Sequence, residues 1–290
     1  MDFTKVLPYL FIVFILSGFQ KDKPVYQIYN HKGKDIKYKN LIEEISGADI
    51  VFFGEIHNNP ISHWLQVEVT KDIYKIDSNL ILGFEMFEAD NQLLVDEFLS
   101  GLISEEKFED ETRLWNNYKT DYKPLISFAK EKNLKVIASN VPRRYASLVF
   151  KGGLNGLNAL SEEAKSYLPP LPIDFDPELE AYKNMMNMMH SKPGDDSTRF
   201  YFPMAQAIKD ATMAWFIKQN YEQGKKVIHF NGAYHSDNYQ GIIWYLKKYL
   251  PGAGIKSIST QEVENVEETE GQEYKADFNI FVVENITKTY

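Results

Sequence analysis

The sequence of 290 residues contains no cysteine. This absence excludes a thiol nucleophile, a redox-active CxxC pair, an iron–sulfur cluster held by cysteine and a structural disulfide. The GxSxG, HExxH, P-loop and GxGxxG motifs are missing as well, so no common hydrolase, zinc-protease or nucleotide-binding signature assigns a function. Positive charge is not in excess either: the formal net charge is -9, which argues against a nucleic-acid partner.

An apolar segment lies at the N-terminus, where Lys5 precedes the hydrophobic run Val6–Leu16. This run is short for a transmembrane helix and is typical of the central region of a signal peptide. We therefore predict a signal peptide or short anchor over residues 1–20 and an exported protein of the periplasm or cell envelope. Residues 16–18 (LSG) would form a lipoprotein box with a following cysteine, but Phe19 stands there, so we expect no lipidation.

Apolar runs alternate with amphipathic segments over most of the chain, which is typical of an α/β fold with a mostly parallel sheet flanked by helices. The predicted strands are Ile50–Phe53, Leu80–Glu85, Lys135–Asn140, Val227–Gly232, Ile255–Ser259 and Phe278–Val283. The predicted helices are Ile61–Ile76, Gln92–Leu99, Glu105–Tyr118, Pro124–Lys132, Pro177–His190, Pro203–Gln223 and Ile242–Tyr249. We predict one α/β domain over residues 21–290, with a smaller helical insertion at 150–202 that forms a lid.

Polar side chains follow four of the predicted strands, at the point where each strand ends. In parallel sheets these carboxyl ends meet at one edge, where ligands bind. The side chains concerned are Glu55 and His57, Glu85, Asn140 with Arg143 and Arg144, and His235. The sequence therefore predicts a single pocket at this edge.

Two chemistries fit these side chains. Glu55, His57, Glu85 and His235 form a ligand set suited to Zn, Mn or Fe(II), and such a metal ion would lower the pKa of a bound water and leave one carboxylate as general base. Arg143 is a candidate for holding an anionic group through a bidentate contact. The alternative is a buried hydrogen-bond network that ties strand ends to helix N-termini.

The predicted helical insertion contains methionine, tyrosine and histidine residues that could contact a cofactor. Four methionines precede His190 and fall on several helix faces, so core or lid packing is the simplest interpretation. The alternative is an apolar slot for a flat cofactor, contacted by Met189, with His190 or Tyr201 as axial ligand. In the sheet, His229 lies within an apolar strand and is predicted to be a core residue.

Five motifs in order resemble the ChaN-like, DUF399-type haem-binding proteins, within the wider grouping of TraB and Tiki proteins. The resemblance covers roughly residues 45 to 245. The motifs are Gly54–His57 (GEIH), Gly83–Phe87 (GFEMF), Ile137–Arg143 (IASNVPR), Ala205–Ala214 (AQ followed by KDATMA) and Gly232–His235 (GAYH).

The resemblance implies an α/β sheet with a smaller helical domain and an exported, iron-linked protein that binds haem, as a homodimer with stacked haems. It also implies a tyrosine as haem ligand with a histidine nearby, for which Tyr201 and His190 are the candidates. Envelope or outer-membrane uptake proteins are the partners to expect. Many members are lipoproteins, and Phe19 departs from that pattern.

Relatives in the wider grouping look like metal-dependent hydrolases built on a Gly-Glu-x-His motif and a later histidine. The matching residues are Glu55, His57, Glu85 and His235. Two functions therefore stand as hypotheses: an exported haem-binding protein, and a metal-dependent hydrolase. In both, the chemistry at the sheet edge is expected to be separate from haem bound at the helical insertion.

Overall fold

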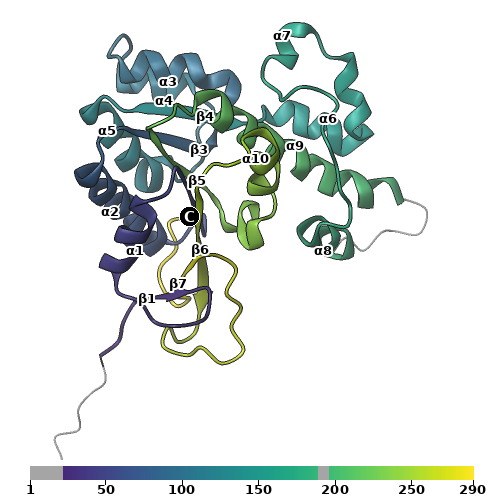
Figure 1. Ribbon diagram of the computed structural model, residues 1–290. Coiled ribbons are helices and arrows are strands. Elements are labelled where there is room, and N and C mark those ends of the chain that lie inside the picture. The colour runs from purple at the N-terminus through teal and green to yellow at the C-terminus, as the bar shows by residue number, and fades with distance from the viewer. Residues whose placement is uncertain (1–21, 189–195) are drawn as a thin grey trace, which may run out of the picture.

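A seven-stranded sheet runs through the molecule in the order β1-β7-β6-β2-β5-β3-β4 (Figure 1). The structure is a computed structural model and describes residues 22–188 and 196–290. β1 pairs antiparallel with β7, and all the other pairings of this sheet are parallel. The predicted α/β fold with a mostly parallel sheet is thus confirmed. The strands are β1 Tyr26–Asn30, β2 Ile50–Glu55, β3 Leu80–Glu88, β4 Lys135–Asn140, β5 Lys226–Gly232, β6 Ile255–Val263 and β7 Phe278–Val283.

Helices cover both faces of the sheet, with α1 to α5 on one side and α6 to α10 on the other (Figure 1). Helices α6 to α9 form a lobe that projects from the second side. The helices are α1 Tyr38–Ser46, α2 Pro60–Ile76, α3 Gln92–Leu99, α4 Glu105–Glu111, α5 Lys123–Lys132, α6 Arg143–Gly152, α7 Glu162–Lys165, α8 Glu180–Met188, α9 Asp196–Asn220 and α10 Ile242–Tyr249.

Strand β2 shows how the apolar runs build two cores. All six of its residues are buried, and successive side chains point to opposite faces. Val51 and Phe53 pack in the core beneath α1, α2 and α5, whereas Ile50 and Phe52 pack in the core beneath α6, α9 and α10. A strand covered on both faces needs apolar residues at consecutive positions, which explains the uninterrupted apolar run in the sequence.

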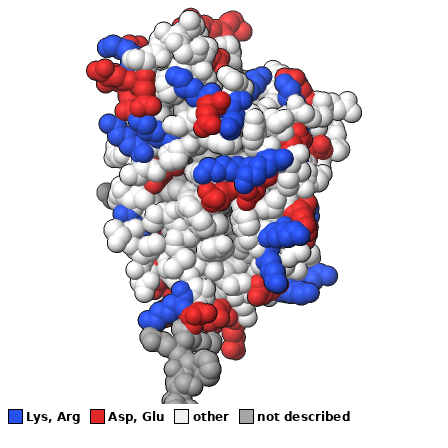
Figure 2. All heavy atoms as spheres, turned by 90° about the vertical axis from the view of Figure 1, so that its left-hand side faces the viewer, with Lys and Arg blue, Asp and Glu red and all other residues white. Residues whose placement is uncertain are grey.

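The face covered by α1 to α5 carries acidic and basic side chains side by side rather than in separate fields (Figure 2). Several of these form ion pairs within one helix or between neighbouring helices, such as Lys75 with Asp72 and Lys123 with Glu109. Pairs of this kind at the surface add little to stability. Among the described residues, no helix is long and apolar enough to cross a membrane.

Three predicted helices have different bounds in the structure. The helix predicted over Glu105–Tyr118 ends at Glu111, and a π-helical turn, η2, covers Tyr118–Tyr122. Just after this helix end, Arg113 forms ion pairs with Glu88, at the end of β3, and with Asp90.

The other two changes lie in the lobe. Helix α8 begins at Glu180, three residues after the predicted start at Pro177, and is described to Met188. Helix α9 begins at Asp196 and ends at Asn220, so that Pro203 lies inside the helix rather than at its start. A proline inside a helix removes one backbone donor, and the sequence pattern alone favours placing it in the first turn. Residues 1–20, Met189 and His190 lie outside the described residues.

A glycine at the end of β2 is required by the close approach of two other segments. A Cβ atom on Gly54 would lie 2.8 Å from the Cα of Ala233 and 2.9 Å from the carbonyl oxygen of Ile258. We expect Gly54→Ala to lower the free energy of unfolding by about 2–3 kcal/mol, because backbone on two neighbouring segments must move.

Urea unfolding, compared with a Gly152→Ala control, measures this effect. No atom lies within 4 Å of a Cβ built on Gly152, at the end of α6, so that substitution should change stability by less than about 1 kcal/mol. Equal effects of the two substitutions would contradict the prediction.

Candidate functional site

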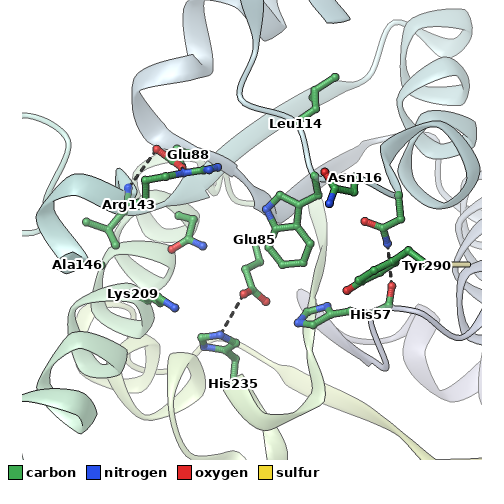
Figure 3. A pocket seen from close by; sticks show the side chains of 14 residues that line it. His57, Glu85, Glu88, Leu114, Asn116, Arg143, Ala146, Lys209, His235 and Tyr290 are labelled. Atoms are coloured by element: carbon green, nitrogen blue, oxygen red, sulfur yellow. Dashed lines mark hydrogen bonds and ion pairs between the residues drawn. The ribbon is translucent and has the colours of Figure 1, made fainter. Parts of the chain in front are cut away.

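A cavity of about 710 Å³ opens at the carboxyl edge of the sheet, where β2, β3, β4 and β5 end (Figure 3). Three of the side chains predicted for this edge, His57, Glu85 and His235, lie around its centre, and Arg143 lies at its rim. The complete lining is His57, Glu85, Glu88, Leu114, Trp115, Asn116, Asn117, Asn140, Val141, Arg143, Ala146, Lys209, His235 and Tyr290.

The turn from β2 into α2 fixes the position of His57. Asn59 caps α2, since its Oδ1 accepts hydrogen bonds from the backbone nitrogens of Ile61 (3.0 Å) and Ser62 (3.2 Å). Pro60 is the first residue of the helix. The backbone carbonyl of His57 is also held, at 2.8 Å from Nδ2 of Asn117.

Glu55 lies behind His57 and does not line the cavity. Its Oε1 is 2.8 Å from Nδ1 of His57 and accepts a 2.6 Å hydrogen bond from the hydroxyl of Tyr122. Its Oε2 accepts a 2.5 Å hydrogen bond from Nε2 of Gln66. The carboxylate is 2% exposed. Glu55 therefore orients the imidazole of His57 from within the core.

The pKa values of this pair follow from burial and from mutual attraction. Burial alone would raise the pKa of Glu55, but the hydrogen bond to His57 and the adjacent ring of His63 hold it below its usual value. Burial acts to lower the pKa of His57, whereas Glu55 and Glu85 raise it, and the net pKa lies above the usual value. Burial, reinforced by the Glu55 charge, raises the pKa of Tyr122.

A second histidine is held between two carboxylates. Nε2 of His235 is 3.1 Å from Oε1 of Glu85, and Nδ1 is 2.5 Å from Oδ1 of Asp210 on α9. The other oxygen of Glu85 accepts a 2.8 Å hydrogen bond from the backbone nitrogen of Gly232. The other oxygen of Asp210 accepts a 2.8 Å hydrogen bond from the hydroxyl of Tyr182. Both ring nitrogens of His235 are thus engaged.

These buried charged groups shift one another's pKa values strongly. Burial acts to lower the pKa of His235, but Glu85 and Asp210 outweigh it and raise that pKa to about 10. Burial would raise the pKa of Glu85, yet the positive charge of His235 holds it well below its usual range. Burial keeps the pKa of Asp210 above its usual value, although His235 lowers it in part. His235 is therefore a fixed cation at neutral pH.

His229 is a core residue, as predicted from its apolar strand. His229 is fully buried, its Nε2 is 2.8 Å from Oγ of Ser139, and its Nδ1 is 3.0 Å from Oδ1 of Asn231. Burial lowers its pKa to about 4, so the ring is neutral. Ser139 donates its hydroxyl to the carbonyl of Phe84 at 2.7 Å. This serine–histidine pair is structural.

Arginines and carboxylates form a network at the rim. Glu88 at the end of β3 binds the guanidinium of Arg143 and that of Arg113, which lies 3.0 Å away. Asp90 binds Arg113 and, at 2.5 Å, Arg144. Arg143 thus points to a carboxylate of the chain itself.

The predicted metal site is not assembled in the described part of the chain. Within residues 22–188 and 196–290, no group of three or more His, Asp and Glu side chains is arranged to hold a metal ion. The physical reason lies in the hydrogen bonds: Glu55 turns both oxygens toward donors behind the cavity, and both ring nitrogens of His235 face carboxylates. Three of the four predicted ligands meet at the cavity, but not as ligands of one ion.

One candidate haem ligand, Tyr201, lies away from this cavity. Tyr201 is on α9 in the helical lobe, where its ring stacks against Gly153: a Cβ atom there would lie 2.9 Å from Cε1 of Tyr201. Tyr201 does not line the cavity. Met189 and His190 are outside the described residues.

Three residues that line the cavity were not predicted from the sequence. Lys209, Trp115 and Tyr290 line the cavity from α9, from the segment before η2 and from the C-terminal segment. Trp115 packs its ring edge-on against His57, with centroids 4.9 Å apart. None of the three belongs to a strand-end pattern. Lys209 is the first residue of the KDATMA motif, and this motif was the one signal for it in the sequence.

Comparison with known proteins gives one family and a small number of relatives. A family model described as "Haem-binding uptake, Tiki superfamily, ChaN" matches residues 41–246, which include all cavity-lining residues except Tyr290. The chain is 26% identical over 204 residues to Protein RETICULATA-RELATED 5, chloroplastic, of Arabidopsis thaliana. That match covers 66% of this chain but spans only 27% of the length of the plant protein.

The structure is similar to a solved structure titled "Cofacial heme binding to ChaN of Campylobacter jejuni". The match has a TM-score of 0.65 and 17% sequence identity, and it covers 89% of this chain and 96% of the other. At this identity the likeness shows a shared fold.

Proposed function

Because the chain belongs to the haem-binding uptake family of ChaN, within the Tiki superfamily, we propose that it is an exported protein that binds haem for iron acquisition. The family match over residues 41–246 is the observation that carries this proposal. The apolar N-terminal run after Lys5 supports export to the periplasm or cell envelope, and Phe19 supports a form without lipid.

We propose that haem binds at the helical lobe rather than at the sheet edge. Phe150 on α6 and Phe200 on α9 are 38% and 47% exposed, and the ring of Phe150 contacts that of Phe202 with centroids 6.3 Å apart. Exposed aromatic side chains next to a tyrosine suit a flat apolar ligand. The cavity at the sheet edge, by contrast, has several charged side chains in its lining, among them Glu85, Glu88 and Arg143.

The described residues fit an axial ligand from Tyr201. Its hydroxyl makes no hydrogen bond to another described residue, and its ring lies on the same helix as the exposed aromatic residues. Bound haem supplies an iron centre that accepts a phenolate or imidazole. We propose Tyr201 as the ligand.

A homodimer with stacked haems extends the proposal. The Campylobacter protein with the same fold is described as binding haem cofacially. Two copies of this chain that face one another through their helical lobes would bury exposed Phe150 and Phe200 together with the haem faces. Envelope or outer-membrane uptake proteins would then deliver or receive the haem.

Haemin titration of the purified protein tests the proposal. Wild-type protein should show a saturable Soret shift, and Tyr201→Phe should weaken binding by about 10-fold or more, since it removes the iron ligand. Tyr167→Phe is the matched control, because it removes a hydroxyl in the same lobe and should leave the titration unchanged. Absence of saturable binding would refute the haem function.

The location of the haem has a separate control. His57→Gln alters the cavity at the sheet edge and should leave the Soret titration unchanged. Loss of haem binding in this variant, with Tyr201→Phe unaffected, would place haem at the sheet edge instead.

A metal-dependent hydrolase, the other predicted function, has the meeting of His57, Glu85 and His235 in its favour. To serve as a ligand, Glu55 would have to give up three donors in the core, and His235 would have to leave a carboxylate. These side chains therefore do not fit a metal ion as they stand, and we derive no step through one.

A further inference from the structure

One lysine at the cavity of the sheet edge has no anionic partner. Lys209 lines the cavity from α9 and is only partly exposed, yet it forms no ion pair with a carboxylate of the described residues. Its neighbour Asp210 is already engaged, because it binds His235 and accepts a hydrogen bond from Tyr182. A partly buried ammonium has lost some of its hydration, so an anion from outside the chain would stabilise it.

The rim beside Lys209 also has more positive than negative charge. Three guanidinium groups share two carboxylates there: Arg113, Arg143 and Arg144 with Glu88 and Asp90. Lys209 adds a fourth cation and no further carboxylate. Four cations against two anions leave an excess of two positive charges on this side of the cavity.

Arg143 has donors available for a second acceptor. It binds Glu88 through Nε and through its backbone nitrogen (3.1 Å), so this contact does not use its two terminal nitrogens. Figure 3 shows Arg143 and Lys209 on the side of the cavity that lies opposite His57 and Tyr290. Because Arg143 begins α6 and Lys209 lies on α9, the two side chains offer separate points of attachment.

Asn140, at the end of β4, is a polar side chain without a partner. It lines the cavity and is 9% exposed. Its Oδ1 is buried and accepts no hydrogen bond, and its amide nitrogen donates none to another described residue. Buried polar side chains are nearly always hydrogen-bonded, so this amide points to a ligand. Since β4 packs against α9, an anion held by Lys209 could accept from the amide nitrogen as well.

We propose that this side of the cavity is a binding site for a small dicarboxylate, separate from the haem site. One carboxylate of the ligand pairs with Lys209 and accepts a hydrogen bond from Asn140. The other carboxylate accepts from the terminal nitrogens of Arg143. The two negative charges of the ligand match the excess of two positive charges in the chain, and the ligand binds reversibly without a covalent step.

The arrangement favours two carboxylates over one phosphate. A phosphate dianion places both charges on a single group, whereas the two cations come from different helices. A carboxylate is planar and suits the parallel donors of a guanidinium. Glu85 and Glu88 also line the cavity and would repel an anion with two charges at one point. A monocarboxylate would leave one of the two cations without a partner.

Equilibrium dialysis with radiolabelled succinate near neutral pH, where both of its carboxyl groups are ionised, tests the proposal. Binding should be saturable. Butyrate, which has the same chain length and one carboxylate, and inorganic phosphate should each compete about 10-fold or more less strongly than unlabelled succinate, because each loses one charge-assisted contact. Absence of saturable binding would overturn the proposal, and so would equal competition by butyrate or stronger competition by phosphate.

Substitution of either cation should weaken succinate binding. Lys209→Met and Arg143→Gln should each lower the affinity by about 10-fold or more, and Lys209→Arg, which keeps the charge, should restore most of it. The side chain of Arg143 is 62% exposed, so its substitution leaves the fold intact and provides an independent test if Lys209→Met does not fold. Wild-type affinity in Arg143→Gln would contradict the assignment.

Each of these variants has a matched control. Arg144→Gln removes a guanidinium of the same rim that does not line the cavity, and Lys218→Met removes an ammonium of α9 that lies over the ring of Trp215. Both should stay within about 2-fold of wild type, because neither charge contacts the ligand. Losses equal to those of Lys209→Met would show a general effect of charge and overturn the site.

Haem carries two propionates, so competition between the ligands separates the two sites. A Soret titration with haemin in saturating succinate should match the titration without it. Displacement of haem by succinate would overturn the proposal, because the same cations would then hold the propionates. Succinate binding in a protein that binds no haem would refute the haem function and leave this site standing.

Discussion

A His235→Ala variant loses about 3–5 kcal/mol of its free energy of unfolding, the cost of leaving buried charges without their partner. The imidazole lies between Glu85, 3.1 Å away, and Asp210, 2.5 Å away. Both carboxylates are almost completely buried, at 4% and 1% exposed. Without the ring, two like charges face one another in a medium that solvates neither.

Urea unfolding followed by circular dichroism measures this loss near neutral pH. The loss should be smaller at about pH 5, because the two carboxylates can then take up a proton and relieve their repulsion. His31→Ala, at an exposed position, is the control and should match wild type within about 0.5 kcal/mol. A loss below about 1 kcal/mol in His235→Ala would contradict the buried ion pairing.

The wild-type protein becomes less stable as the pH rises above neutrality, and His235 is the main cause. Its pKa is raised from 6.5 to about 10 in the folded protein. Its contribution is therefore fully present below about pH 6.5, where the unfolded chain also carries the proton, and is lost as the pH rises toward the folded value. One additional bound proton in the folded state corresponds to about 1.4 kcal/mol per pH unit.

Unfolding free energies from about pH 7 to about pH 9 should thus fall by about 2–3 kcal/mol in wild type. In His235→Gln the dependence of the unfolding free energy on pH should be weaker by the contribution of about one proton, which is about 1.4 kcal/mol per pH unit. The remaining slope reports other groups, among them His57, whose pKa is also raised. Identical slopes in the two proteins would show that His235 is neutral in the folded state.

These two predictions separate the roles of the two histidines at the sheet edge. His235 is 6% exposed and holds carboxylates of β3 and α9 together, so its loss should appear first in stability. His57 has a side chain that is 35% exposed, so its loss should cost less stability than the loss of His235.

A large part of the fold could be predicted from the sequence. Runs such as Ile50–Phe53 and Leu80–Glu85 identified buried parallel strands, because a strand covered on both faces has no polar positions. The helix predicted from Ile61 begins one residue earlier, at Pro60, because Asn59 caps it and a residue without a backbone donor suits the first position. Helix bounds were less predictable where a distant contact intervened, as at Arg113.

By itself, the sequence determined that polar residues follow four apolar strands and would gather at one edge, since parallel strands end on the same side. The tertiary structure alone decided which side chains face one another. Placing β2 beside β5, with β3 on its far side, brings Gly232 next to His57 and Glu85, while α9 adds Lys209 and Asp210. A buried carboxylate turns toward whichever donors surround it. For Glu55 those donors are Tyr122 and Gln66, so the glutamate of the GEIH motif lies behind the cavity and leaves His57 to face it.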